Sequence, residues 1–254
     1  MPFGNMTLYS IWELANFISG RSPGGQSITP ERFNILLPQV QGEYYFDRIK
    51  AQDYDALQPF SVTMGDDSMP MTFSGGTAPL PSDYYAGGSG YYMLGADPRR
   101  VNFVSDRTYD YLLTHPTETP SLSHPVGNIQ SNRVRMSPAG VNHIRFTYLR
   151  RASDPFMDYC TDADNPSRII YMPPGSTVSP VPQTSAYNLV DSTGAVIESG
   201  VESRTGDSQY TSATQELEWP ESVQWKLLYL LLLKVGVSLA EGEAEKLSQM
   251  MLAQ

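Results

Sequence analysis

The side chains that could bind a metal ion or act as nucleophiles are few and lie far apart in the sequence. The histidines are His115, His124 and His143, and the single cysteine is Cys160. His115 and His124 each precede a proline, and His143 falls in a segment with strand-like alternation, so polar surface positions explain them better than a metal site does. Cys160 and His143 could in principle pair, but a lone cysteine is more often a small buried hydrophobic residue than a nucleophile.

Acidic side chains gather in one short segment, at Asp158, Asp162 and Asp164, with Asn165 next to them. This spacing resembles a fragment of a calcium-binding loop, but the glycine and the distal glutamate of an EF-hand are missing. We interpret the segment as a solvated turn and leave calcium binding as an alternative. The sequence as a whole predicts no catalytic residue, no metal ligand and no cofactor.

Tyrosines and arginines occur in adjacent pairs through the middle of the chain. A tyrosine ring buries a large area while it keeps a polar hydroxyl, and the arginine fork suits bidentate pairing with carboxylates. Arginine pairs beside tyrosines could also contact a DNA backbone, but the acidic balance of the chain favours contacts between protein subunits. Together with two tryptophans, the predicted contact residues are Tyr84, Tyr85, Tyr91, Tyr92, Arg99, Arg100, Arg150, Arg151, Trp219 and Trp225.

The chain is acidic, with 17 lysines and arginines against 27 aspartates and glutamates and a formal charge of -10. This balance argues against a protein that grips nucleic acid through a basic face. An acidic wall repels phosphates, so it suits a conduit through which DNA slides without being held. We therefore expect the acidic excess to line such a passage.

Neither a secretory signal nor a membrane anchor is expected. The N-terminus lacks the basic flank and the apolar core of a signal peptide. The longest apolar run, residues 227–233, is far shorter than the roughly 20 apolar residues that span a bilayer. A single cysteine also excludes an internal disulfide framework. We expect a soluble protein that is made in a reducing cytoplasm and has no membrane contact.

The two ends of the chain carry helical patterns. Apolar residues at three- and four-residue spacing predict a helix over 7–19, and a second helix begins after Thr29, where Pro38 should kink or split it. A helix over 220–236 has apolar residues on almost every side, which predicts burial all round. A last helix should begin near Ser238.

The middle of the chain is rich in glycine, proline, serine and tyrosine, and it carries strand patterns. A period of two puts Ile144, Phe146 and Tyr148 on one face, and a hairpin is expected around the turn at 191–194. We therefore predict an α+β fold with a helical core from the N- and C-terminal helices and a β-rich middle insertion. The expected parts are an N-terminal helical part at 1–59, a β-rich, loop-rich insertion at 60–215, and C-terminal helices at 216–254 that pack on the N-terminal part.

Three segments, in their order along the chain, carry a resemblance to a known family. They are SIWELANFISGRSPGGQSITPERFNILLPQVQGEYYFDRI near the start, HIRFTYLRRASDPFMDYC in the middle, and LEWPESVQWKLLYLLLLKVGVSLAEGEAEKLSQ at the end. This pattern resembles the head-to-tail adaptor or ring proteins of crAss-like, short-tailed phages that infect Bacteroidales. The region 60–130 has no counterpart in the resemblance.

The resemblance implies a place in the virion. Such proteins form a homo-oligomeric, twelve-subunit ring in the neck or tail, with a helical core and a β-rich outer or lower part. The expected partners are the portal protein and adjacent tail ring proteins, with transient and non-specific contact to double-stranded phage DNA in the bore. Assembly would take place in the cytoplasm of the host bacterium.

Two other functions stay open as alternatives. The chain could be another virion component, such as a capsid-decorating or cargo protein, in which case the β-rich middle would be surface-exposed and the protein monomeric or trimeric. A tail-associated glycan hydrolase needs only two carboxylates in a cleft, but no pair is singled out by its spacing.

Overall fold

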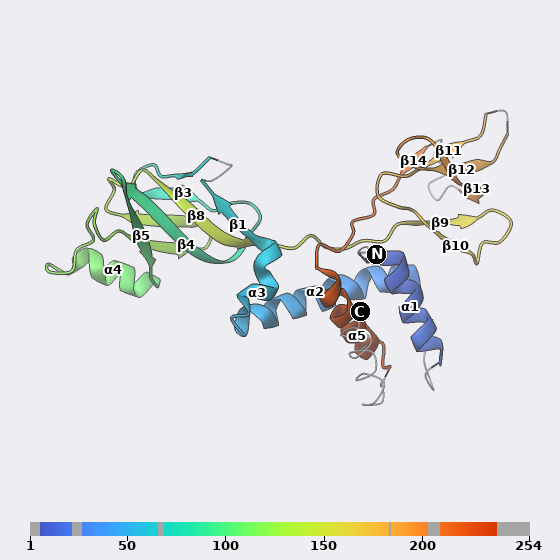
Figure 1. The fold of residues 1–254 in the computed structure, drawn as a ribbon, viewed down its shortest axis with the longest axis horizontal. Coiled ribbons are helices and arrows are strands. Elements are labelled where there is room, and N and C mark those ends of the chain that lie inside the picture. The colour runs from blue at the N-terminus through green and yellow to red at the C-terminus, as the bar shows by residue number, and fades with distance from the viewer. Residues whose placement is uncertain (1–5, 22–26, 66–68, 183, 203–208, 238–254) are drawn as a thin grey trace. The chain divides into compact units, whose positions relative to one another are not determined.

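The structure, a computed structural model, describes residues 6–21, 27–65, 69–182, 184–202 and 209–237. The chain divides into two compact units (Figure 1). Unit 1 contains Met1–Gln52 and Ser153–Gln254, and unit 2 contains Asp53–Ala152. Among the described helices, none is long and apolar enough to cross a membrane.

Unit 2 is built on one sheet of eight strands. Seven strands follow the order β1-β8-β4-β5-β6-β7-β3, and β2 also pairs with β8. All neighbours are antiparallel except β5 and β6, which are parallel and are connected through helix α4. The strands are β1 (Ser61–Met64), β2 (Met71–Thr72), β3 (Thr77–Pro79), β4 (Tyr84–Leu94), β5 (Asp97–Phe103), β6 (Val126–Gln130), β7 (Arg133–Ser137) and β8 (His143–Arg150). The helices are α3 (Tyr54–Leu57), the 3-10 turn η1 (Gln58–Phe60) and α4 (Asp106–Thr114).

The core of unit 2 lies on one face of this sheet. Ile144, Phe146 and Tyr148 of β8 are 1%, 0% and 5% exposed, so the predicted period of two is confirmed. They pack against residues of the neighbouring strands and loops, including Val101 and Val134. This packing fixes which face of each strand is buried.

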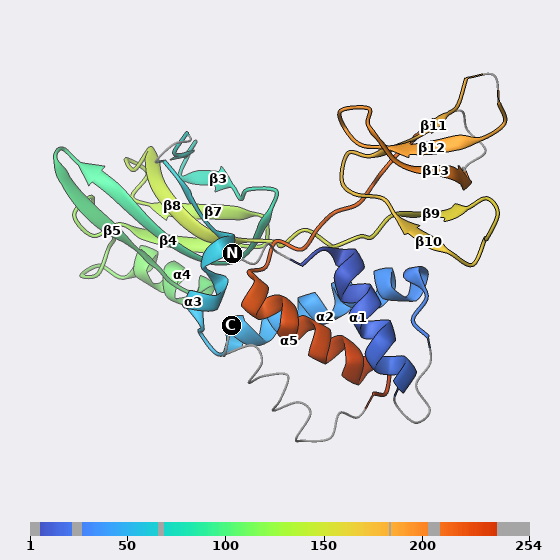
Figure 2. The same cartoon turned by 45° about the vertical axis from the view of Figure 1, so that its right-hand side comes forward.

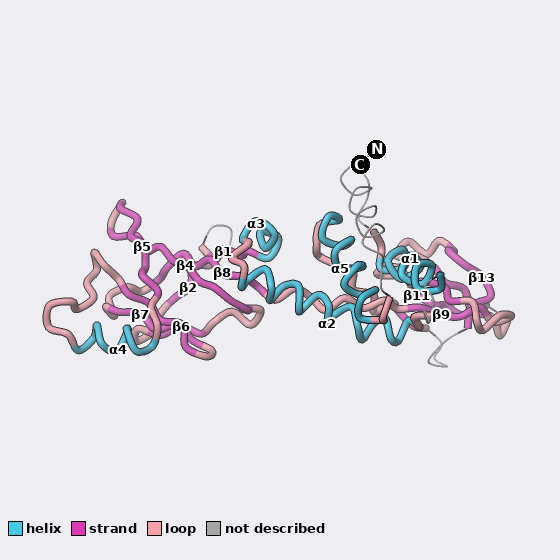
Figure 3. Tube along the Cα trace, turned by 90° about the horizontal axis from the view of Figure 1, so that it is seen from below, coloured by secondary structure: helices cyan, strands magenta, loops and turns pink. Residues whose placement is uncertain are grey.

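In the residues that the structure describes, unit 1 combines helices with a second sheet (Figure 3). Its six strands are antiparallel and follow the order β10-β9-β13-β12-β11-β14. The strands are β9 (Tyr159–Asp162), β10 (Ile169–Tyr171), β11 (Thr177–Pro180), β12 (Tyr187–Val190), β13 (Val196–Glu202) and β14 (Tyr210–Thr211). The helices are α1 (Leu8–Arg21), α2 (Pro30–Lys50) and α5 (Glu221–Lys234), and Figure 2 shows α5 beside α1 and α2.

Helix α2 begins as the sequence predicts and continues through Pro38 to Lys50. The Thr29 hydroxyl accepts a hydrogen bond from the Arg32 amide at 3.3 Å, and Pro30 occupies the first turn. Pro38 lies inside one continuous helix and does not split it. Leu37 and Val40 are buried beside it, so the packing of this face offsets the lost backbone hydrogen bond.

Helix α5 is buried on one side only, so the expectation of burial all round is wrong. Val223, Leu227 and Leu231 are buried, whereas Tyr229 and Leu233 are 39% and 45% exposed. The reason is that α1 and α2 cover one side of α5, and its apolar residues extend beyond that side. The last helix expected from Ser238 lies outside the described residues.

The predicted α+β architecture, a helical core with one β-rich insertion, is contradicted. The described residues form two separate sheets, and among them residues in strands outnumber those in helices. The strand-rich stretch divides between two units, because its apolar residues form two independent cores. The second core, around Met172 and Leu189, belongs to the unit that contains the terminal helices.

The close packing of unit 2 predicts a specific sensitivity. A Cβ added to Gly127 would lie 2.7 Å from Phe103 Cε1 and 3.1 Å from Val101 Cγ1. We expect Gly127→Ala to lower the free energy of unfolding by about 1–3 kcal/mol, measured by urea denaturation. The matched control is Gly42→Ala in α2, where a Cβ meets nothing within 4 Å, and it should raise that free energy by about 0.5–1 kcal/mol. Equal effects of the two variants would contradict this packing.

Candidate interaction surface

The structure places several of the predicted tyrosines and arginines opposite one another as cross-strand pairs. Tyr91 of β4 lies opposite Arg100 of β5 and opposite Arg145 of β8. Directly opposed residues of antiparallel strands share a face, so these three side chains lie on one side of the sheet. Tyr92 lies opposite Arg99, and this pair is on the other side.

The side that carries Tyr91 is the one turned away from the core. Arg145 alternates with the buried Ile144 and Phe146, and Tyr91 is 47% exposed. We call this side of β1, β2, β4, β5 and β8 the outer face. Among the described residues of these strands, the only carboxylate is Asp97, which lies opposite Leu94 on the other side and forms an ion pair with Arg99 at 3.5 Å. The outer face of these strands therefore carries arginine, histidine, tyrosine and methionine side chains without a carboxylate.

A groove of about 590 Å³ lies on the outer face. Its walls are mainly apolar, with the polar side chains of His143 and Arg145 among them. Gly65 is needed at its edge, because its φ is +104° and a Cβ there would lie 3.2 Å from Arg145 Cα. The residues that line it are Gly65, Pro70, Tyr91, Met93, Pro98, His143, Arg145 and Thr147. We call this feature the outer-face groove.

The other predicted residues of unit 2 lie at a different end of the sheet. Tyr84 lies opposite Arg150, and the Arg150 guanidinium lies 5.4 Å from the centre of the Phe60 ring. Tyr85 is 41% exposed, and the Arg151 amide donates to the Asp83 carbonyl at 2.7 Å. The predicted contact residues of unit 2 thus form two groups, and Tyr91 of the first group borders the outer-face groove.

The two predicted tryptophans belong to unit 1. Trp219 is 1% exposed and meets the Tyr44 and Tyr45 rings edge to face at 5.3 and 5.7 Å. Its position therefore stabilises the interior of its own unit. Trp225 lies on α5 and is half-buried.

The residues considered for chemistry do not form a reactive site in the described part of the chain. Cys160 is 1% exposed inside the core of unit 1, whereas His143 is in unit 2. In the ranges that the structure describes, no three His, Cys, Asp or Glu side chains are placed to hold a metal ion. His143 borders the outer-face groove, and the Thr117 hydroxyl contacts His115 Nδ1 at 3.1 Å.

Asp158 is buried, which differs from the solvated position that we expected. Its carboxylate accepts hydrogen bonds from the amides of Tyr159 and Ala213, at 2.9 and 3.0 Å, and from the Tyr210 hydroxyl. A buried carboxylate is costly unless such donors surround it. Asp158 therefore connects β9 to β14 within the sheet of unit 1.

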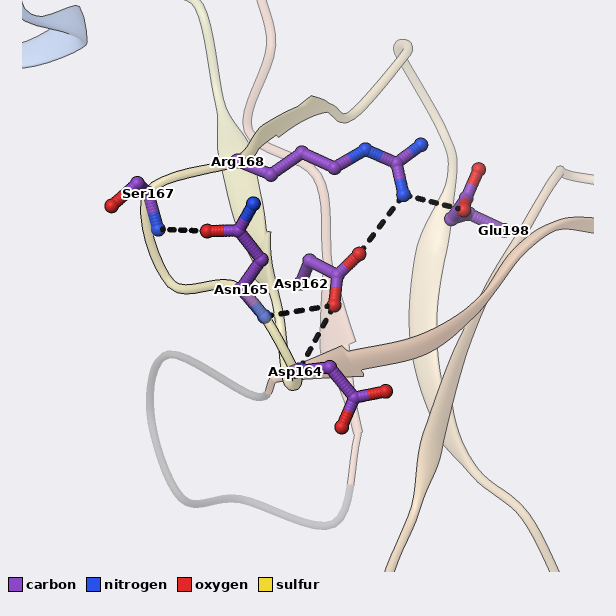
Figure 4. A network of polar contacts seen from close by, with 6 residues as sticks. All are labelled: Asp162, Asp164, Asn165, Ser167, Arg168 and Glu198. Carbon is purple, nitrogen blue, oxygen red and sulfur yellow. Dashed lines mark hydrogen bonds and ion pairs between the residues drawn. The ribbon is translucent and has the colours of Figure 1, made fainter.

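Asp162 is the last residue of β9, and Asp164 and Asn165 lie in the exposed turn that follows it (Figure 4). Its carboxylate accepts from the amides of Asp164 and Asn165 at 2.9 and 3.2 Å. Arg168 then bridges Asp162 and Glu198, at 2.9 and 3.2 Å. The amide of Asp164 first, and then the Arg168 guanidinium, lower the pKa of Asp162 below its usual value. These contacts join the β9–β10 turn to β13.

No protein-family model matches the chain, and no curated protein matches it.

Sequence reasoning identified Tyr91 and Arg100 of the outer face. It paired the tyrosines and arginines by type, but it did not include Met93, Pro98 or Arg145 among the contact residues. A signal for Arg145 existed, because the alternation of HIRFTYLR places it opposite the buried residues. Pro98 and Met93 depend on the register of β4 and β5, which the sequence pattern does not specify.

Tyr148 lies on the buried side of β8. The pH dependence of its contribution to stability tests which side of this strand faces the core. Its hydroxyl donates to Asp83 Oδ1 at 2.8 Å, and burial, followed by this hydrogen bond, raises the pKa of Tyr148 to about 12. The unfolded phenol has a pKa of about 10, so the folded state holds the proton more tightly and this stabilisation is lost as the pH rises from 10 through 12. We expect Tyr148→Phe to cost about 1 kcal/mol at pH 8 in urea unfolding, and the cost should shrink above pH 10. A cost that stays constant from pH 8 to pH 11.5 would contradict the assignment.

Proposed function

We propose that the chain is a non-enzymatic structural subunit of a phage virion. In this proposal it forms an oligomeric ring in the portal-to-tail connector or tail barrel, where it is a conduit for genome ejection. The observation that carries the proposal is the outer face, on which exposed Tyr91 and Met93 lie beside Arg100 and Arg145 on a hydrogen-bonded sheet. The order of the three segments that resemble phage ring proteins supports the same function.

The composition of the outer face suits contact between proteins. Tyrosine, methionine and arginine are enriched at protein interfaces, because they bury large areas at a small loss of side-chain freedom or bind carboxylates with a planar fork. A sheet fixes such side chains in place before binding, which lowers the entropic cost of association. Apolar side chains that are exposed on one face also raise the free energy of the isolated chain in water. A partner that covers them removes this cost.

The charges of the two units are unequal, and this suits a conduit. Unit 1 contains 18 acidic residues and nine basic ones, whereas unit 2 contains nine acidic residues and eight arginines. Nearly all of the acidic excess is therefore in unit 1. In a ring through which DNA passes, unit 1 would repel phosphates, and unit 2 would supply arginines for contacts with neighbouring proteins such as the portal and adjacent tail rings.

The assembly state tests this proposal. We expect purified protein, alone or with the portal protein, to form closed rings of high rotational symmetry, measured by native mass spectrometry and by class averages from negative-stain microscopy. A monomer or trimer that persists with the portal would contradict the ring. That result would favour a capsid-decorating or cargo protein, and glycan-hydrolysis assays would then test the enzymatic alternative.

A matched pair of variants tests the role of the outer face. Tyr91→Ser with Arg100→Ser should raise the concentration needed for assembly at least about tenfold, because exposed aromatic and arginine side chains contribute about 1–2 kcal/mol each at interfaces. The control is Tyr111→Ser with Arg107→Ser on α4, which removes the same residue types from exposed positions of the same unit. Native mass spectrometry at several concentrations measures both. Equal effects of the two variants would exclude a specific role for the outer face.

A further inference from the structure

The hairpin of β12 and β13 in unit 1 has an exposed apolar tip. Val196 and Ile197 are 56% and 45% exposed. The register of the hairpin shifts between the pairs Leu189–Glu198 and Val190–Val196, so Ile197 lies at a β-bulge next to the turn, and both apolar side chains are exposed there. Further along the hairpin, Leu189 and Val201 are buried in the core of the sheet. The tip alone is therefore left for another contact.

The turn at this tip is held in one conformation. Asp191 Oδ1 accepts hydrogen bonds from the Thr193 amide and hydroxyl, at 2.8 and 2.6 Å, and from the Ala195 amide at 2.9 Å. The Gly194 amide donates to the Asp191 carbonyl at 3.0 Å, and the φ of Gly194 is +87°. A preformed tip loses little conformational freedom when it binds.

Ion pairs fix the strand that leaves the tip. Glu198, the residue after Ile197, pairs with Arg168, which also pairs with Asp162 on β9 (Figure 4).

The Thr193 hydroxyl first, and then the amides of the turn, lower the pKa of Asp191 below its ordinary value. The tip therefore presents two branched apolar side chains and a carboxylate that is ionised at neutral pH.

The outer-face groove of unit 2 is the complement of such a tip. Tyr91, Met93 and Pro98 give it apolar walls, and Arg100, opposite Tyr91, adds positive charge to the same face. Its volume of about 590 Å³ is within the range that is typical of ligand-binding pockets in proteins. Apolar side chains of the tip would bury against apolar walls, and the acidic unit would meet the arginine-bearing face.

We propose that the β12–β13 tip of one copy inserts into the outer-face groove of a second copy. This inference rests on the proposed function as a ring subunit, and it names the contact between subunits. The tip and the groove are different surfaces, so the contact is heterologous and repeats from copy to copy. Heterologous contacts close into a ring when the rotation between copies permits it.

Disulfide cross-linking between separate chains tests the contact directly. The only native cysteine, Cys160, is buried, so engineered cysteines react over a low background. Full-length Met93→Cys and Ile197→Cys chains are mixed under mild oxidation, and disulfide-linked dimers are measured on non-reducing gels. The matched control replaces Met93→Cys with Leu113→Cys, an exposed position on α4. We expect dimers to form at least tenfold faster with Met93→Cys than with Leu113→Cys.

The double variant and the native mass separate the possible outcomes. A chain with both Met93→Cys and Ile197→Cys should give a ladder of linked multimers. An internally linked monomer, with no dimers from the mixture, would show that the tip binds the groove of its own chain and would overturn the contact between copies. Closed rings without cross-links would overturn the contact and leave the ring proposal intact. Cross-linked chains that never close would support the contact and overturn the ring, and the absence of both would overturn both.

Discussion

The candidate surface depends on the alternation of side chains along β8. Ile144, Phe146 and Tyr148 must point into the core, and this forces His143 and Arg145 to the opposite side. β8 pairs with β4 on one edge and with β1 and β2 on the other. The side of β8 that faces the core therefore decides which face of each neighbouring strand is exposed. A shift of one residue would bury an arginine and expose a phenylalanine, which carries a cost on both faces.

Unit 1 is held together by a different means, in which side chains of the helices bind the backbone of the segments around its sheet. Asn34 of α2 accepts from the Met157 amide and donates to its carbonyl, at 2.8 and 2.9 Å. Gln41 of α2 donates to the Ser153 carbonyl at 2.9 Å, and Glu218, which precedes α5, accepts from the Ser153 amide at 3.2 Å. Such bonds satisfy backbone groups in segments without regular pairing. The sheet, and with it the β12–β13 hairpin, is thereby fixed to the helices.

The sequence predicts local features well and long-range ones poorly. The cap at Thr29 and the alternation of β8 follow from short patterns, and both are confirmed. The pairing of Tyr91 with Arg145 joins residues that are far apart in the chain, and a bulged register between Tyr84 and Ser89 sets it, so no local pattern contains it. The single β-rich insertion was wrong for the same reason, because alternation identifies strands without assigning them to a sheet. The one-sided burial of α5 also depends on which helices cover it.

Hydroxyl-radical footprinting of the assembled and the dilute protein tests the central claim most directly, because it reads the exposure of individual side chains. Tyr91 and Met93 on the outer face are 47% and 50% exposed in the single chain, and Tyr111 on α4 is 51% exposed and is an internal reference. If the outer face is a contact surface, the oxidation of Tyr91 and Met93 falls severalfold on assembly while that of Tyr111 is unchanged. Assembly that leaves Tyr91 and Met93 as reactive as they are in the dilute chain would contradict the account.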